Sequence, residues 1–163
     1  MIFTKKKFRT CELKQKPGPM KLVLDQEELT NCFFEDCRLL GIMVPIKDYQ
    51  FCWYLNNLMG IDFRINNDIE IQLKRKKRDY FFSVFEFPEP TTSLAHYLYN
   101  NKFDGEYLLP EFKHLDFLWL FKGDRVPDRE VQEKINMIRE ITPVQLVVEL
   151  TNENIKHKEN LVF

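Results

Sequence analysis

The run Leu-Asp-Phe-Leu-Trp-Leu-Phe at residues 115–121 is the most apolar segment of the chain, and it limits the possible folds most strongly. It has the length of a β-strand, and Gly123-Asp124 ends it. Residues 79–87 predict a second long strand, with aromatic side chains on both faces. A strand of that kind is typical of the middle of a sheet. The chain therefore needs a sheet that is covered on both faces.

Shorter patterns predict further strands. Ile69, Ile71 and Leu73 alternate with polar residues, which is typical of a strand with one face in water. Asp104-Gly105 is a turn signal between two of the predicted strands. The remaining predicted strands cover residues 21–24, 38–44, 62–65, 68–73, 94–100, 106–109 and 144–150.

Two segments predict amphipathic helices. The first covers residues 49–59, with Asp48 as a capping residue and Gly60 as the residue that closes it. The second covers about residues 128–141, between a proline before it and a Thr-Pro pair after it. The apolar stripe of this second helix consists of Val131, Ile135 and Ile138.

Strands and helices do not alternate regularly in this order, so a doubly wound parallel sheet is disfavoured. The order indicates an α+β fold, with a mainly antiparallel, curved sheet of about six to eight strands and two main amphipathic helices. The length of 163 residues suits one domain. The 15 phenylalanines predict a thick aromatic core, because each ring buries a large apolar area.

The two ends of the chain differ from the middle. Residues 1–19 are basic and end in Lys-Pro-Gly-Pro, so they form either a basic arm or an extension upstream of a natural start at Met20. Residues 20–151 are expected to form the single α+β domain. Residues 152–163 form a polar tail that is expected to fray, although its last three residues, 161–163, could dock.

The composition argues against several classes of protein. The net charge of −1 does not attract the whole molecule to nucleic acid or to an anionic membrane. No apolar run approaches the ~20 residues of a membrane span, and no secretory signal follows the basic start. The four cysteines have spacings that match no zinc or thioredoxin-type motif. We therefore expect reduced thiols, a cytoplasmic location, no cofactor and no bound transition metal. The cysteines are Cys11, Cys32, Cys37 and Cys52.

Residues 109–117, Leu-Pro-Glu-Phe-Lys-His-Leu-Asp-Phe, resemble the signature of the IPExxxVDY family of small bacterial proteins. Pro110, Glu111 and Asp116 match the signature, whereas its Ile, Val and Tyr are replaced by Leu, Leu and Phe. Residues 40–42, 48–56 and 79–87 look like the same family, so the resemblance covers about residues 20–150. It implies a compact cytosolic bacterial protein and no particular activity. It directs attention to Glu111, Asp116, Trp53 and Asn56.

The acids Glu111 and Asp116 form the most specific candidate site. Glu111 follows Pro110, which can start a helical turn whose free N–H groups favour a carboxylate. Asp116 lies at the start of the apolar strand, and we expect it to be mostly buried and bonded to N–H groups near Pro110. Two close acids could hold a divalent cation or act as an acid/base pair. Alternatively, both acids fix the turn into the strand.

Trp53 and Asn56 are three residues apart on the first predicted helix and so share a face. A tryptophan near an amide can line a ligand pocket. The alternative is a core tryptophan and an asparagine that bonds a neighbouring backbone group. The three histidines, His96, His114 and His157, give little support for a histidine-based catalytic centre.

Residues 74–78, Lys-Arg-Lys-Lys-Arg, are five consecutive basic residues between two predicted strands. We expect them to form the tip of a hairpin that fans all five side chains outward. Lys74, Arg75, Lys76, Lys77 and Arg78 could contact an anionic partner, or they could be a solvated turn that keeps an edge strand soluble. No glycine-rich phosphate loop accompanies them, and no readout of a DNA sequence is expected.

Two classes of function remain open. The first is a non-catalytic module that binds a protein or an RNA-containing partner, partly through the basic hairpin. The second is a small enzyme or ligand-binding protein that uses Glu111 and Asp116. The sequence favours the first class, because it contains no recognisable nucleophile–base pair or cluster of metal ligands.

Overall fold

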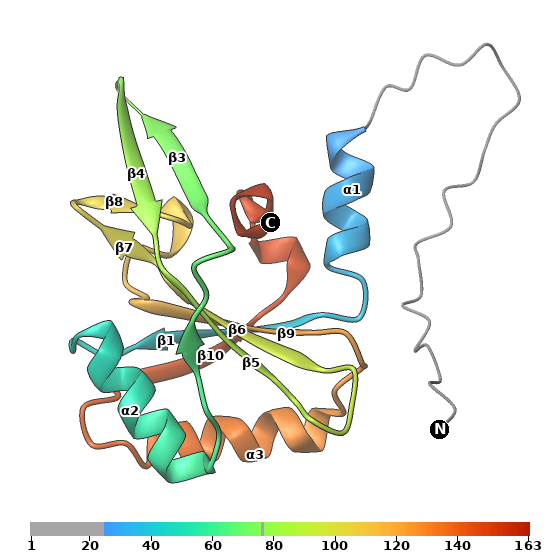
Figure 1. The fold of residues 1–163 in the computed structure, drawn as a ribbon, viewed down its shortest axis with the longest axis vertical. Helices are drawn as coiled ribbons and strands as arrows, with labels where there is room; N and C mark the ends of the chain where they lie inside the picture. The colour runs from blue at the N-terminus through green and yellow to red at the C-terminus, as the bar shows by residue number, and fades with distance from the viewer. Residues whose placement is uncertain (1–24, 76) are drawn as a thin grey trace, which may run out of the picture.

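A six-stranded sheet forms the middle of the protein in a computed structural model, which describes residues 25–75 and 77–163 (Figure 1). All five pairs of neighbouring strands are antiparallel, which confirms the predicted α+β fold with a mainly antiparallel sheet. In spatial order the strands are β10 (Leu146–Leu150), β1 (Arg38–Met43), β9 (Phe117–Lys122), β6 (Ala95–Asn100), β5 (Val84–Pro88) and β2 (Arg64–Ile65).

The helices α2 (Asp48–Met59) and α3 (Asp128–Arg139) both cover one face of this sheet (Figure 1). The predicted apolar stripe of α3 is buried there, together with Phe51, Cys52 and Leu55 of α2. Gly60 ends α2 in the left-handed conformation, with φ of 63°, as its position after the last apolar residue predicts. Both predicted helices are therefore confirmed, and the first begins at Asp48 rather than after it.

The opposite face of the sheet carries smaller elements (Figure 1). One of them is the helix α1 (Gln26–Phe33), which the sequence did not predict. The strand predicted at residues 21–24 lies outside the described residues. The other elements on this face are the hairpin β3 (Ile71–Arg75) and β4 (Arg78–Phe82), the hairpin β7 (Lys102–Phe103) and β8 (Glu106–Tyr107), and the short 3-10 helices η1 (Pro110–Phe112), η2 (Asn152–Asn154) and η3 (Lys158–Leu161).

Two cores therefore exist, one on each face, and β9 contributes to both. Phe117, Trp119 and Phe121 belong to the core between the sheet and the helices α2 and α3. Leu118 and Leu120 join the core on the opposite face. This alternation explains why the segment is apolar at nearly every position, and it confirms the predicted buried strand.

The single strand expected at residues 79–87 is wrong. The chain breaks at Ser83, so that β4 pairs only with β3 in the protruding hairpin while β5 enters the main sheet. The Ser83 carbonyl accepts a hydrogen bond from the Asn100 N–H at 3.1 Å. The aromatic residues on both faces thus serve two different sheets, and β5 lies beside the edge strand β2 rather than in the middle.

The expected fraying of residues 152–163 is also wrong. Leu161 and Ile155 are buried in the second core. The Tyr99 hydroxyl donates to the Leu161 carbonyl at 3.0 Å, and the Phe163 ring packs edge-on against Phe33. A few apolar side chains are therefore enough to dock a segment that is polar on average.

No helix in the described part of the chain has the length and apolar character needed to cross a bilayer. Cys37 and Cys52 are free thiols, as expected for them. Cys32 is disulfide-bonded, so the expectation of reduced thiols is wrong for this residue. Burial raises the pKa of the Cys52 thiol to about 12 and that of the Cys37 thiol to about 11. Both thiols therefore stay protonated at neutral pH and are poor nucleophiles. Cys11 lies outside the described residues.

Candidate functional site

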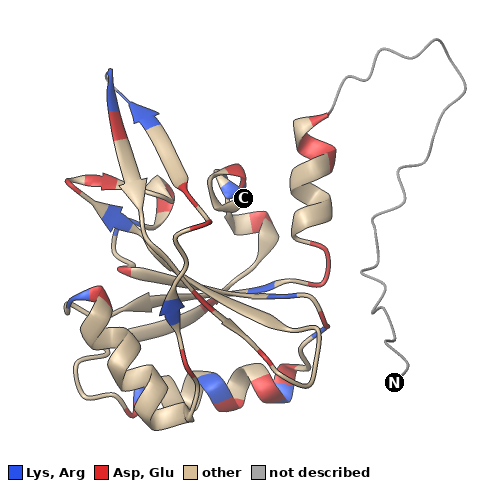
Figure 2. Cartoon of the chain, in the orientation of Figure 1, with Lys and Arg blue, Asp and Glu red and all other residues tan. Residues whose placement is uncertain are grey.

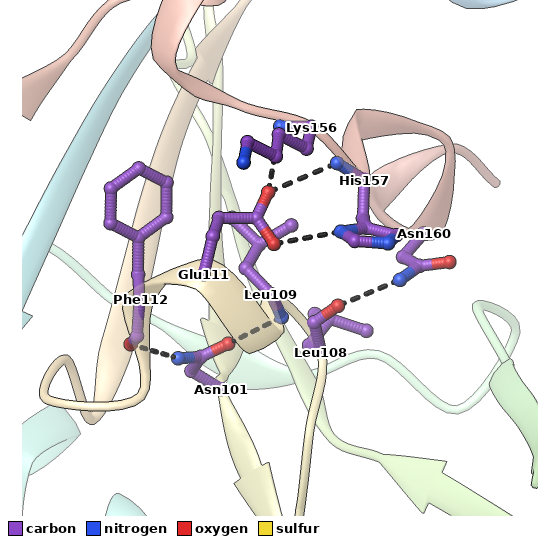
Figure 3. Close-up of polar contacts among 8 residues, drawn as sticks. All are labelled: Asn101, Leu108, Leu109, Glu111, Phe112, Lys156, His157 and Asn160. Carbon is purple, nitrogen blue, oxygen red and sulfur yellow. Dashed lines mark hydrogen bonds and ion pairs between the residues drawn. The ribbon is translucent and has the colours of Figure 1, made fainter.

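Glu111 holds the C-terminal segment against the body of the protein (Figure 3). Its Oε1 accepts hydrogen bonds from the backbone N–H groups of Lys156 at 2.7 Å and His157 at 3.0 Å. Its Oε2 lies 2.8 Å from His157 Nδ1. Pro110 starts η1 as predicted and so fixes the backbone that carries Glu111. We call this set of contacts the Glu111 clamp.

The clamp favours the ionised form of the carboxyl group. Burial alone would raise the pKa of Glu111, but the hydrogen bonds from His157 and Lys156 outweigh it, and the net pKa lies below the ordinary value. Charge-assisted bonds of this kind are stronger than neutral ones. Both carboxylate oxygens are thus occupied in fastening one part of the chain to another.

Asp116 fastens a different part of the chain. Its Oδ2 accepts a hydrogen bond from the Val44 N–H at 2.8 Å, just after β1. The prediction that Asp116 binds N–H groups near Pro110 is therefore wrong, because its hydrogen bond goes to the residue after β1. The prediction that it is mostly buried is also wrong, since Asp116 is half-buried. Burial raises its pKa, with a partial opposing effect from the Val44 N–H and from Lys102. Within the described chain, Glu111 and Asp116 share no hydrogen bond or partner.

Asn101 is the residue of this region that sequence reasoning missed. It is fully buried, and its Nδ2 donates to the carbonyls of Phe112 at 3.0 Å and Leu115 at 2.8 Å. Its Oδ1 accepts from the Leu109 N–H at 2.8 Å (Figure 3). One amide therefore satisfies three backbone groups of the loop that carries Pro110 and Glu111. An asparagine outside the signature gave no signal of this role.

His96 is a second buried polar residue that the sequence did not single out. It is 1% exposed, and its Nδ1 accepts from the Trp119 indole N–H at 3.2 Å, so the proton lies on Nε2, 3.0 Å from Glu89. Burial lowers the pKa of His96, although Glu89 partly opposes this effect. Both ring nitrogens are therefore occupied by neighbours, as in a structural histidine.

No group of three or more metal-ligand side chains occurs in residues 25–75 and 77–163. The two carboxylates that could have held a cation are engaged with backbone N–H groups instead. The geometry here favours the structural alternative for Glu111 and Asp116.

Trp53 and Asn56, the other candidate pair, have separate roles. The Asn56 amide makes two hydrogen bonds with the backbone of Phe63. Its Oδ1 accepts from the Phe63 N–H at 2.8 Å, and its Nδ2 donates to the Phe63 carbonyl at 3.2 Å. Trp53 is 61% exposed, so it is not a core residue. The pair therefore lines no common pocket.

Trp53 belongs to an exposed apolar surface on α2. Its neighbours on the helix are Tyr49, which is 65% exposed, and Tyr54 and Leu58, which are each 38% exposed. We call these four residues the aromatic patch. Asp48 is the one charged residue within α2, and Figure 2 shows the rest of the helix without charge. The sequence left Trp53 as either a pocket residue or a core residue, and its exposure contradicts the second alternative.

A groove of about 350 Å³ lies between the aromatic patch and the end of α3. The side chains of α2 that line it are Trp53, Tyr54, Asn57 and Leu58, and those at the end of α3 are Glu140, Ile141 and Thr142. Trp53 and Tyr54 meet edge-to-face, with ring centroids 5.2 Å apart. We call this hollow the α2–α3 groove.

A larger groove of about 560 Å³ lies beside the edge strand β2. Its polar side chains mostly bond one another: Arg64 pairs with Asp62 at 2.6 Å, and Asn66 donates to Glu86. The two bonded pairs leave few of the lining groups available to a ligand.

The basic segment forms a hairpin tip, as predicted, but the expected fan of five side chains is wrong. Arg75 pairs directly with Arg78, so that residues 74, 75 and 78 belong to strands whose side chains alternate between two faces. Lys74 lies opposite Asp79, and Arg78 forms an ion pair with Asp104 at 2.5 Å. Lys76 lies outside the described residues, and Lys77 is exposed in the turn. The cluster is thus divided and partly neutralised (Figure 2).

No protein-family model matches the chain, and no curated protein matches it either. The resemblance to the IPExxxVDY family therefore stays a prediction. The roles given above to Glu111 and Asp116 rest on their contacts alone.

Proposed function

We propose that this protein is a non-catalytic interaction module that binds a protein partner through the aromatic patch. The observation that carries the proposal is the exposure of Tyr49, Trp53, Tyr54 and Leu58 on one helix. Trp and Tyr are the residue types that most often dominate the binding energy of protein interfaces. An exposed cluster of large apolar side chains is a common mark of such an interface.

The rest of α2 supports this reading. Its buried side, with Phe51 and Leu55, already anchors the helix to the sheet, so the exposed side is not needed for folding. A helix held by its own core presents its outer residues on a rigid support. Rigid aromatic side chains lose little conformational entropy on binding, which makes them efficient contacts.

The test is partner capture from cells with the double variant Tyr49→Ala/Trp53→Ala. The proposal expects capture of a defined protein by the wild type and at least a tenfold loss in the double variant, about 1.4 kcal/mol. Ile65→Ala is the matched control, because Ile65 is an equally exposed apolar residue on β2, outside the patch. Equal capture by all three proteins would refute the proposal.

An RNA-containing partner at the basic hairpin is a second candidate. Lys77 is exposed in the turn and Lys74 on the adjacent strand, and both project from a hairpin that extends beyond the sheet (Figure 1). The ion pair of Arg78 with Asp104, and the position of Lys74 opposite Asp79 in the hairpin, weaken this candidate relative to the aromatic patch. Lys74→Ser/Lys77→Ser should reduce capture of RNA, with a steep dependence on salt, if the hairpin binds a phosphate backbone.

A catalytic or ligand-binding role of Glu111 and Asp116 has less support. Each carboxylate satisfies backbone N–H groups of a different segment, and the pair shares no partner in the described chain. The same proposal includes a cytoplasmic location, which the free thiols of Cys37 and Cys52 favour and the disulfide-bonded Cys32 disfavours.

A further inference from the structure

We infer that the α2–α3 groove receives an arginine or lysine side chain of the protein partner. This inference rests on the proposed function, since the groove borders the aromatic patch, and it adds the chemistry that the partner must present. Three properties of the groove support a basic side chain: a carboxylate without an ion-pair partner among the described residues, two electron-rich rings and apolar lining residues.

The carboxylate is that of Glu140. Its side chain is exposed and forms no ion pair with any described residue. Glu140 also caps α3, with its N–H bonded to the carbonyls of Met137 and Ile138. The carboxyl end of a helix carries a partial negative charge, which adds to that of the side chain. Both effects attract a cation and repel an acidic side chain.

The rings of Trp53 and Tyr54 supply the second property. Both rings line the groove, and their planes meet at 76°. A cation over the face of a tryptophan or tyrosine is stabilised by ~0.5–2 kcal/mol. Arginine is favoured over lysine, because its planar group can stack on a ring while it bonds a carboxylate.

The remaining lining groups suit the length of such a side chain. Leu58 and Ile141 offer apolar contact for its methylene stem. The Asn57 Nδ2 donates to the Trp53 carbonyl at 2.7 Å, and the amide oxygen has no donor among the described residues. That oxygen can therefore accept from a guanidinium group.

The test uses the full chain and two synthetic peptides, acetyl-Gly-Leu-Arg-Leu-Gly-amide and its citrulline analogue, which has the same shape without the charge. Binding is followed by the indole N–H resonance of Trp53. The arginine peptide should shift this resonance and bind at least about fivefold more tightly than the citrulline peptide. Glu140→Gln should remove that preference. Glu130→Gln should keep it, because Glu130 lies on the same helix outside the groove.

Several results would overturn the inference. They are equal affinity of the two peptides, no shift of the Trp53 resonance at 10 mM peptide (about the weakest affinity of interest), or an unchanged preference in Glu140→Gln. The proposed function would survive any of these results if Tyr49→Ala/Trp53→Ala still abolished partner capture. It would fail, independently of the groove, if that double variant captured the partner normally.

Discussion

The Glu111 clamp and the α2–α3 groove make opposite use of the same kinds of side chain. At the clamp, the Glu111 carboxylate binds His157 and the backbone N–H of Lys156, while the nearby buried amide of Asn101 satisfies backbone groups of the loop that carries Glu111. At the groove, the Glu140 carboxylate forms no ion pair with any described residue, and the Trp53 ring is 61% exposed despite its contact with Tyr54. Polar groups whose bonds are complete stabilise the fold, whereas groups left available are free to bind another molecule. The comparison predicts large losses of stability at the first region and almost none at the second.

Asn101→Ala is expected to have the largest effect. It leaves the Leu109 N–H and the Leu115 carbonyl without partners in a buried setting, whereas the Phe112 carbonyl keeps the Leu115 N–H as a donor. An unsatisfied buried group costs ~1–3 kcal/mol, so the free energy of unfolding should fall by about 4 kcal/mol. Urea denaturation measures this loss, with exposed Asn67→Ala as the control. A loss below ~1 kcal/mol would show that this loop does not depend on the amide.

Glu111→Gln should lower the free energy of unfolding by about 2 kcal/mol at pH 7, because charge-assisted bonds to His157 and Lys156 become neutral. The pKa of Glu111 is lowered by folding, so its contribution is present above the unfolded pKa of ~4.3 and is lost as pH falls through the folded value. The difference between the two proteins should therefore shrink toward pH 3.5. Exposed Glu153→Gln, in the same C-terminal segment, should show no such trend. A difference that stayed constant with pH would contradict an ionised clamp.

The sequence predicted one of these two regions and not the other. Pro110, Glu111 and Asp116 stood out because a proline fixes the backbone and acids near an apolar strand need donors. Their actual partners, His157 and Val44, are distant in the sequence, and no local pattern encodes such a contact. For the same reason, Asn101 was missed, and the docking of residues 161–163 was only an alternative to fraying.

The strands and helices followed the periodicity of the chain more closely. β9 was predictable as a continuous apolar run of strand length that ends at a turn signal, and α3 because its apolar residues fit the helical period. The break at Ser83 was not, since the aromatic run continues through it and only tertiary pairing divides it. Trp53 was assigned to either a pocket or the core because burial on a helix depends on what packs against it, which a single helix does not reveal.

Asp116→Asn sharpens the comparison with Glu111, because the two acids should respond to pH in opposite directions. Burial raises the pKa of Asp116, so its ionisation opposes folding as pH rises through the folded value. The variant keeps an acceptor for the Val44 N–H and lacks the charge. It should lose about 1 kcal/mol near pH 3.5 and less at pH 7. Denaturation of both variants at the two pH values tests this, and parallel trends for Glu111 and Asp116 would refute the assignment.

Trp53→Ala should have the smallest effect on stability, and it tests directly whether Trp53 has a structural role. A core Phe→Ala change costs ~3–5 kcal/mol, which is the expectation for buried Phe51 two residues earlier on α2. Trp53 is 61% exposed and makes its ring contact with Tyr54, so its loss should change the free energy of unfolding by no more than ~0.5 kcal/mol. Urea denaturation of Phe51→Ala and Trp53→Ala compares the contributions of the buried and exposed sides of α2 to stability. If Trp53→Ala were destabilising by ~2 kcal/mol or more, the tryptophan would have a structural role. That result would contradict the proposal that the aromatic patch is a binding surface.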